Sequence, residues 1–172
     1  MNYGHILQSK KHQLWVFAAL DVPTKFWINF EVGSRTTYTA NRLVKTLKLF
    51  GNWTEDKILK ITTDKLAAYK NALSIHLTNI PYKYLQIIKK RFKRYITLVS
   101  KNVLFTGNKK DFPQGTQNTS FIERSNLTLR QHVSYLARKT LGYCKKKTNF
   151  NRMLWINLYN YNYVQFHKRV TS

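Results

Sequence analysis

The sequence predicts one α/β domain with a central mixed sheet flanked by helices, and three observations support this prediction. The chain has 172 residues, which fits a single domain. Hydrophobic residues make up 43% of the chain, too much apolar material for a disordered basic tail. Residues 3–73 show the order strand, strand, strand, helix, strand, helix, which is typical of a sheet covered by helices.

The first three strands form an antiparallel meander in this interpretation. Residues 3–7 fit one short strand, and residues 14–20 are a continuous apolar run, as in a buried strand. Pro23 marks the turn that follows. The stretch "FWINFEV" then alternates strictly, which places four side chains on one face of the third strand: Phe26, Ile28, Phe30 and Val32.

A helix and a fourth strand come next. Apolar residues recur at helical spacing, and Gly51 is placed to end the helix; these residues are Ala40, Leu43, Val44 and Leu47. The stretch "KILKITTD" predicts a fourth strand that ends at Asp64. A helix over "KLAAYKNAL" starts directly behind this aspartate.

The second half of the chain has a weaker pattern. Residues 75–110 are compatible with one or two strands or with a basic helix, and the range of about 75–115 is interpreted as a basic insertion. Turn residues in "FPQGTQNTS" precede a helix that starts near Phe121 and turns Ile122, Leu129, Val133 and Leu136 inward. An aromatic-rich last helix completes a C-terminal helical part over about 121–168.

Charge is the strongest indication of function. Thirty Lys and Arg residues face seven Asp and Glu, which gives a formal net charge of +23. Such a surface repels itself unless it meets a polyanion, and contacts to phosphates release counterions. Nucleic acid is therefore the favoured partner, and a membrane-surface or ribosome-associated protein is the alternative.

Cysteine content and hydropathy bear on the compartment. Cys144 is the single cysteine, so no disulfide framework can form within the chain, and its surroundings favour a structural role. No stretch approaches the ~20 apolar residues of a membrane span. We therefore expect a soluble cytoplasmic protein that has no membrane partner.

Two of the seven carboxylates stand where a site could form. Asp64 lies where a strand ends and a helix begins, a usual place for a site in an α/β sheet and also a favoured N-cap position. Glu123 lies in the first turn of a helix, where Ser120-Phe121-Ile122-Glu123 fits a capping box. Each acid is therefore either a helix cap or a ligand of an oxygen-preferring cation such as Mg²⁺. The other five acids are interpreted as turn or solvated residues: Asp21, Glu31, Glu55, Asp56 and Asp111.

Basic clusters are the candidate contacts to nucleic acid. The stretch "KKRFKRY" interleaves cations with aromatic rings that can stack on exposed bases; its cations are Lys89, Lys90, Arg91, Lys93 and Arg94. Arg124 and Arg130 follow Glu123 and either hold that carboxylate ionised or contact phosphates. A solvated charged face is the alternative for each cluster.

Four stretches resemble, in this order, the transposases of the insertion-sequence-one family: "LWVFAALD", "FEVGSRT", "ITTDKLAAYK" and "IERSNLTLRQHVSYLARKT". The resemblance covers nearly the whole chain. Its most specific part is the last stretch, where the family pattern appears as Ile122-Glu123-Arg124, Asn126, Leu129-Arg130 and Arg138-Lys139-Thr140.

This resemblance implies a ribonuclease-H-like core with a DDE triad. Asp64 and Glu123 would be two of three carboxylates that hold Mg²⁺ or Mn²⁺, for metal-dependent cleavage and transfer of DNA strands during transposition. Five further residues are implied in positioning DNA or ordering the site: Arg124, Asn126, Arg130, Arg138 and Lys139. The implied partner is double-stranded DNA, at element ends and target, bound by a homo-oligomer in the nucleoid.

The chain also departs from the family pattern. The first catalytic aspartate of the family would fall just before Met1, so we expect an N-terminally truncated form that is inactive or nearly so alone. The upstream zinc-binding and helix-turn-helix part of such proteins is an expected partner. Two other classes remain open: an inactive relic or regulator that binds DNA without cutting it, and an RNA-binding protein of the translation apparatus.

Overall fold

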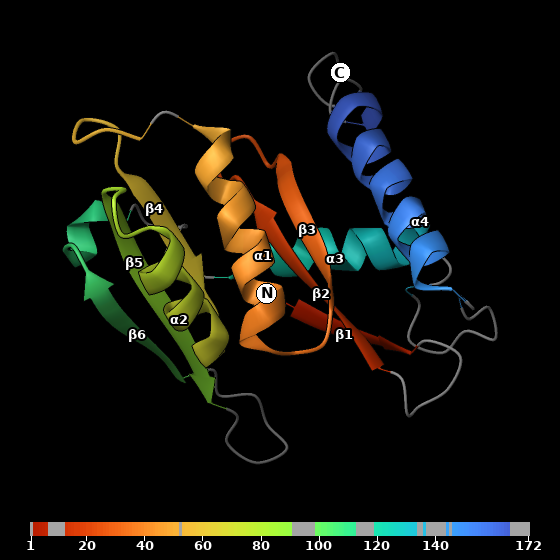
Figure 1. The fold of residues 1–172 in the computed structure, drawn as a ribbon, viewed down its shortest axis with the longest axis horizontal. Helices are drawn as coiled ribbons and strands as arrows, with labels where there is room; N and C mark the ends of the chain where they lie inside the picture. The colour runs from red at the N-terminus through yellow and green to blue at the C-terminus, as the bar shows by residue number, and fades with distance from the viewer. Residues whose placement is uncertain are drawn as a thin grey trace.

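A computed structural model describes most of the chain. The described residues are 2–6, 13–51, 53–90, 99–112, 119–133, 136, 144 and 146–165. They form a mixed α/β structure, as predicted, but with two three-stranded sheets in place of one central sheet. Figure 1 shows α1 and α2 in front of the strands, α3 behind them and α4 beside β3.

The first sheet is the predicted antiparallel meander. It has the order β1 (Asn2–Ile6), β2 (Gln13–Leu20) and β3 (Trp27–Gly33). Successive residues of β2 enter different cores: Val16 and Ala18 belong to one, and Phe17 belongs to the other. Burial on both faces explains why β2 is apolar at every position from Leu14 to Leu20 rather than at alternate ones.

The predicted alternation of β3 is wrong at its start. Asn29 pairs with Ala19 and Trp27 pairs with Leu20, so Ile28 is an extra residue without a partner on β2. This bulge reverses the side-chain direction, and Trp27 shares a core with Phe30 and Val32 in place of Phe26 and Ile28.

The second sheet joins parallel and antiparallel pairs. Its strands are β4 (Leu59–Thr63), β5 (Tyr82–Lys90) and β6 (Val99–Thr106). β4 pairs with β5 in parallel, and β5 pairs with β6 in antiparallel. The range predicted as a basic insertion therefore supplies two strands, and the alternative of a basic helix is wrong for them.

The prediction of one central sheet is also wrong for the described residues. They form two separate sheets. β1 pairs with β2 only from Gln13 to Phe17, and no described strand lies between the rest of β2 and β4 to join the two sheets.

Four α-helices cover the sheets in the described part of the chain. They are α1 (Thr37–Leu47), α2 (Ala67–His76), α3 (Ser120–His132) and α4 (Lys147–Tyr159). A 3-10 turn over Lys48–Phe50 extends α1 to Gly51, another covers Lys109–Asp111, and a π-helix over Asn160–Gln165 continues α4. None of these helices is long and apolar enough to span a bilayer, within the residues described.

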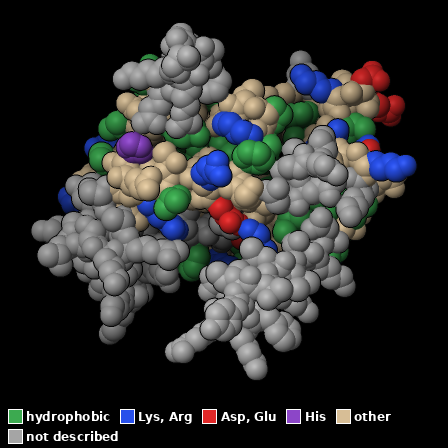
Figure 2. Space-filling model, turned by 180° about the vertical axis from the view of Figure 1, so that it is seen from behind, with side chains coloured by type: hydrophobic (Ala, Val, Ile, Leu, Met, Phe, Trp, Pro, Cys, Tyr) green, Lys and Arg blue, Asp and Glu red, His purple; other side chains and the backbone are tan. Residues whose placement is uncertain are grey.

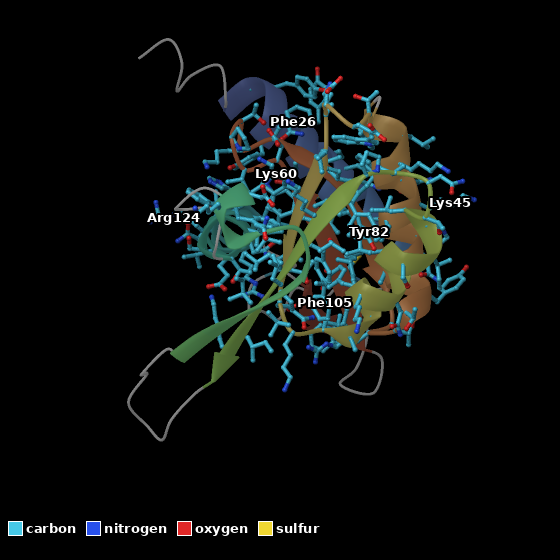
Figure 3. The ribbon with its side chains drawn as sticks, turned by 90° about the vertical axis from the view of Figure 1, so that its left-hand side faces the viewer. Phe26, Lys45, Lys60, Tyr82, Phe105 and Arg124 are labelled. Carbon is cyan, nitrogen blue, oxygen red and sulfur yellow. The ribbon has the colours of Figure 1, made fainter. Side chains whose placement is uncertain are left out.

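Two large cores hold these layers together. One lies between the first sheet and the pair α3 and α4, and includes Val16, Trp27, Leu129 and Phe150. The other joins β2 and the second sheet to α1 and α2, and includes Phe17, Val44 and Leu73. Figure 3 shows the result in side view: the α1 side, with Lys45, lies opposite the α3 side, with Arg124.

Candidate functional site

Asp64 leaves β4 at the carboxyl end of the strand, as predicted. Its carboxylate Oδ1 accepts a hydrogen bond from the backbone N–H of Leu66 at 3.2 Å. α2 begins only at Ala67, with Leu66 as its N-cap, so Asp64 stands two residues before the cap position. The cap interpretation is therefore wrong in position, although the carboxylate still orders the turn that leads into α2.

Buried tyrosines lie close to this acid. The Thr63 hydroxyl and the Tyr84 hydroxyl are 2.8 Å apart, and Gln86 Nε2 donates to Tyr84 at 3.4 Å. Burial and, after it, the negative charge of Asp64 raise the pKa of Tyr69. Burial is also the main cause that raises the pKa of Tyr84. Both phenols stay protonated at neutral pH, so neither competes with Asp64 as an anion.

Glu123 has a different environment from the one the capping box predicts. α3 begins at Ser120 with Thr119 as its N-cap, so Glu123 is the fourth helical residue and its N–H bonds to Thr119 O at 3.0 Å. Its side chain accepts from the Thr119 hydroxyl at 2.6 Å and forms an ion pair with Lys89 Nζ. The Ser120–Glu123 capping box is therefore wrong.

Lys89 joins Glu123 to the strand that neighbours β4. Thr63 pairs with Gln86 across the parallel strands, so Asp64 leaves β4 just beyond the level of Gln86, in the middle of β5. Lys89 lies three residues further along β5 and reaches Glu123 on α3. Asp64 thus stands at the carboxyl end of β4, the edge where α/β sheets bind ligands, and Lys89 ties Glu123 of α3 to the neighbouring parallel strand.

The donor set fits a metal ion only in part. Mg²⁺ in phosphate chemistry takes one or two protein carboxylates and completes its shell with water and phosphate oxygens. Asp64 and Glu123 supply such oxygens, but the Lys89 ammonium now neutralises Glu123. No three Asp, Glu, His or Cys side chains gather into a possible metal site within the described ranges.

The predicted DNA contacts on α3 divide by exposure. Arg124 is exposed, and Figure 3 shows it on the α3 side of the strands. Arg130 is half-buried and has an interaction partner. Asn126 is 3% exposed, and its side-chain amide has no hydrogen-bond partner among the described residues. Asn126 therefore lies in the interior of this structure, where its side chain is not accessible to DNA.

The remaining predicted contacts are only partly described. Lys89 is exposed near the end of β5, and of Lys90 only the backbone is described. Five others lie outside the described residues and stay predictions: Arg91, Lys93, Arg94, Arg138 and Lys139. Figure 2 shows Lys and Arg side chains at several separate places on the face seen from behind, with few acids between them.

The other five acids take no part in this arrangement. Glu55 and Asp56 are exposed, as predicted, and Asp21 accepts from Thr24 N at 3.1 Å in its turn. The solvated interpretation is wrong for two acids. Glu31 is 16% exposed and pairs with Arg42 at 2.9 Å, and Asp111 pairs with Lys83 at 2.8 Å.

The structure also places groups at the site that the sequence did not indicate. The ion pair between Lys89 and Glu123 joins residues 34 apart, and no local pattern predicts such a pairing. The burial of Asn126 had a signal: Ile122, Asn126, Leu129 and Val133 follow helical spacing along one face. Cys144 is buried and donates to Lys146 O at 3.2 Å, in keeping with the structural role expected of it.

Comparison with known proteins gives one match along nearly the whole chain. The chain is 25% identical over 162 residues to the insertion element IS1 protein InsB of Shigella flexneri, a span that covers 93% of this chain and 92% of that protein. No protein-family model matches the chain. No solved structure matches it either. The resemblance to the insertion-sequence-one family that the motifs predict is confirmed by the match to InsB.

Proposed function

We propose that this chain, an InsB-like protein, acts in transposition of an insertion element through a ribonuclease-H-like core that binds double-stranded DNA. The observation that carries the proposal is the placement of Asp64 at the carboxyl end of β4 and of Glu123 on α3, where Lys89 of the neighbouring parallel strand β5 contacts it. These are the two acids that the family motifs assign to a DDE triad. Three antiparallel strands followed by a helix and a fourth strand support the same type of core.

Asp64 and Glu123 would hold Mg²⁺ or Mn²⁺ together with a DNA phosphate. When bound, such an ion supplies Lewis-acid chemistry at a phosphodiester. The residues of the chain do the positioning: the Leu66 N–H fixes Asp64, and the Thr119 hydroxyl fixes Glu123. Lys89 would exchange Glu123 for a phosphate oxygen, because an ammonium group pairs with either anion.

Cleavage and strand transfer with two metal ions need more carboxylates than the two proposed here. Two carboxylates fit one shared cation, so we expect the chain alone to nick DNA poorly. The test is nicking of supercoiled plasmid in Mg²⁺ and in Mn²⁺, and the expected result is little or no nicking. Robust Mg²⁺-dependent nicking that disappears in Glu123→Gln would show that the catalytic site is complete after all.

DNA binding gives a sharper test of the two acids. At constant ionic strength, Mg²⁺ should raise the affinity for duplex DNA by about tenfold, or ~1.4 kcal/mol. Asp64→Asn and Glu123→Gln should each abolish that gain, and the exposed acid Glu55→Gln should keep it. Affinity measured by fluorescence anisotropy over a Mg²⁺ titration checks the prediction.

A second candidate function is DNA binding without any cleavage, as in a relic or a regulator of transposition. The ion pair between Lys89 and Glu123 favours it, because it satisfies the carboxylate without a metal. This candidate predicts binding that is indifferent to Mg²⁺ and to Asp64→Asn. The titration above therefore separates the two functions.

A further inference from the structure

Aromatic rings gather on the exposed side of the C-terminal helix. Trp155, Tyr159 and Tyr163 follow one another at intervals of four residues along α4 and the π-helix, so they form one stripe. They are 47%, 63% and 49% exposed, respectively. Figure 1 shows α4 at the margin of the molecule, with one side turned away from the sheets. Large rings that lie exposed next to one another mark an interaction site.

These rings are held in place by contacts among themselves and with β3. The ring centroids of Tyr159 and Tyr163 are 4.9 Å apart, and those of Phe26 and Tyr163 are 5.7 Å apart. Trp155 packs on the buried ring of Phe30 at 4.7 Å. Rings that are already fixed lose little conformational entropy when a ligand binds. Phe26, Trp155, Tyr159 and Tyr163 are named the aromatic band below.

The charges around the aromatic band select the kind of partner. Residues 153–165 carry no charged side chain, but Arg152 is exposed one turn before Trp155, and Lys25 directly precedes Phe26. A second copy of this chain brings the same net charge of +23 and is repelled, whereas a polyanion is attracted. Exposed rings beside cations are the arrangement that binds unpaired nucleotides, because bases stack on the rings and cations hold the phosphates.

The aromatic band begins next to the candidate functional site. The Lys25 ammonium lies 3.4 Å from the ring centroid of Phe121, which is in the first turn of α3, two residues before Glu123. Lys25 adjoins Phe26, and Phe26 contacts Tyr163. A nucleic-acid strand that leaves Glu123 on this side therefore meets a cation first and the rings of the band next.

We infer that the aromatic band binds unpaired bases of single-stranded DNA, in the segment that leaves the candidate site. This inference rests on the proposed action on DNA and adds a separated strand to its substrate. A duplex does not fit, because its bases are inaccessible within the stack. Four residues of an α-helix rise by about 6 Å, which exceeds the ~3.4 Å per nucleotide along each strand of a duplex. Rings at this spacing suit bases that are spread apart.

The first test compares a short deoxyuridine strand with an abasic strand of equal length, by fluorescence anisotropy in EDTA. The two strands carry the same phosphates and differ only in their bases. The parent chain should bind the deoxyuridine strand about tenfold more tightly. Tyr159→Ala should remove most of this preference and leave the affinity for the abasic strand unchanged. Tyr159→Phe should retain the preference, since the ring is kept.

Ile156→Ala is the matched control. Ile156 is 62% exposed on the same helix and is apolar without being aromatic, so its loss should leave the preference intact. Equal affinity of the parent chain for both strands would overturn the inference. Equal losses in Tyr159→Ala and Ile156→Ala would also overturn it, because they would indicate a general apolar contact. A parent dimer that both variants dissociate, measured by sedimentation, would assign the band to an interface between copies instead.

Tryptophan fluorescence gives a second test that needs no change in affinity. The structure describes all four tryptophans, and Trp155 is the exposed one among them. The deoxyuridine strand should quench the fluorescence of the parent chain, and the abasic strand should not. Trp155→Phe should abolish this quenching. Quenching of the same size in Trp155→Phe would contradict stacking on the aromatic band.

The outcome separates this inference from the proposed function. Because EDTA removes divalent cations, Asp64→Asn should bind the deoxyuridine strand as the parent chain does. Duplex binding that ignores Mg²⁺ would reject the proposed metal site, and the absence of a base preference, with the Mg²⁺ effect intact, would reject this inference alone. A uridine strand that binds more tightly than the deoxyuridine strand would assign the band to RNA and overturn the assignment to DNA.

Discussion

At the scale of residues, the decisive feature is the competition for Glu123. Its carboxylate accepts a hydrogen bond from the Thr119 hydroxyl, at the start of α3, and pairs with the ammonium of Lys89, on β5. Lys89 and Glu123 are about one-third exposed, so their ion pair contributes little to stability, on the order of 1 kcal/mol or less. Its consequence is electrostatic, because the Lys89 ammonium neutralises the carboxylate that a metal ion would need to bind.

Lys89→Met should therefore raise the affinity of the chain for Mn²⁺. The substitution keeps an unbranched side chain that is one atom shorter and removes the charge that neutralises Glu123, and we expect a gain of about tenfold. Lys83→Met is the matched control, since Lys83 lies on the same strand and pairs with Asp111 instead. Mn²⁺ binding measured by electron paramagnetic resonance checks this. A gain of equal size in both variants would show that only net charge matters.

Glu31 gives a residue-scale prediction about pH. Burial raises the pKa of Glu31 above its usual value, and the Arg42 guanidinium beside it only partly offsets this. The folded chain then binds more protons than the unfolded chain around the carboxylate pKa, so stability falls as pH rises through that range. Glu31→Gln should remove this loss: more stable than the parent at pH 7, with the difference vanishing near pH 4. Urea unfolding at both pH values measures it, and a parent that is more stable at pH 7 would reverse the sign.

At the scale of elements, Asn162 joins the C-terminal helix to the first sheet. Its Oδ1 accepts from Trp27 N at 2.9 Å, and its Nδ2 donates to Trp27 O at 3.0 Å. This buried amide completes the outer edge of β3 next to the bulge at Ile28. Asn162 lies in the π-helix that follows α4, so its two hydrogen bonds fix this helix against β3 beside the bulge.

Asn162→Ala should therefore destabilise the fold by about 2–5 kcal/mol, because two buried backbone groups lose their partner. Asn160→Ala, in the same π-helix but exposed, should change the free energy of unfolding by less than about 0.5 kcal/mol. Thermal unfolding of both variants compares them. Similar small losses would mean that water replaces the amide at Trp27.

The elements differ in how far the sequence determines them. β2 and α1 were predictable because each carries a pattern within its own residues: a continuous apolar run, and a helical period. The bulge at Ile28 was not, because one extra residue leaves the composition of a strand unchanged. The ion pair of Glu123 was not either, since it depends on how β5 approaches α3. Asn126 was predictable as buried from its helical spacing, and the family motif drew attention to DNA instead.

At the scale of the whole molecule, charge dominates. A formal net charge of +23 on 172 residues opposes compaction, and two cores with apolar faces offset it. Cations are spread over both faces, so net charge alone predicts attraction to DNA without saying where it lies. The site proposed at the carboxyl end of β4 and the start of α3 predicts a specific location for DNA, on the α3 side.

Salt dependence distinguishes the two faces. If DNA lies against α3, Arg124→Ala removes one phosphate contact and reduces the slope of log affinity against log salt by about 0.9. Lys45 is the matched control: it is exposed on the α1 side, and Figure 3 shows it across the strands from Arg124. Lys45→Ala should leave the slope unchanged. Binding isotherms at a series of NaCl concentrations give both slopes. Equal reductions would indicate a diffuse attraction to the whole cationic surface, and a reduction confined to Lys45→Ala would place the DNA on the opposite face.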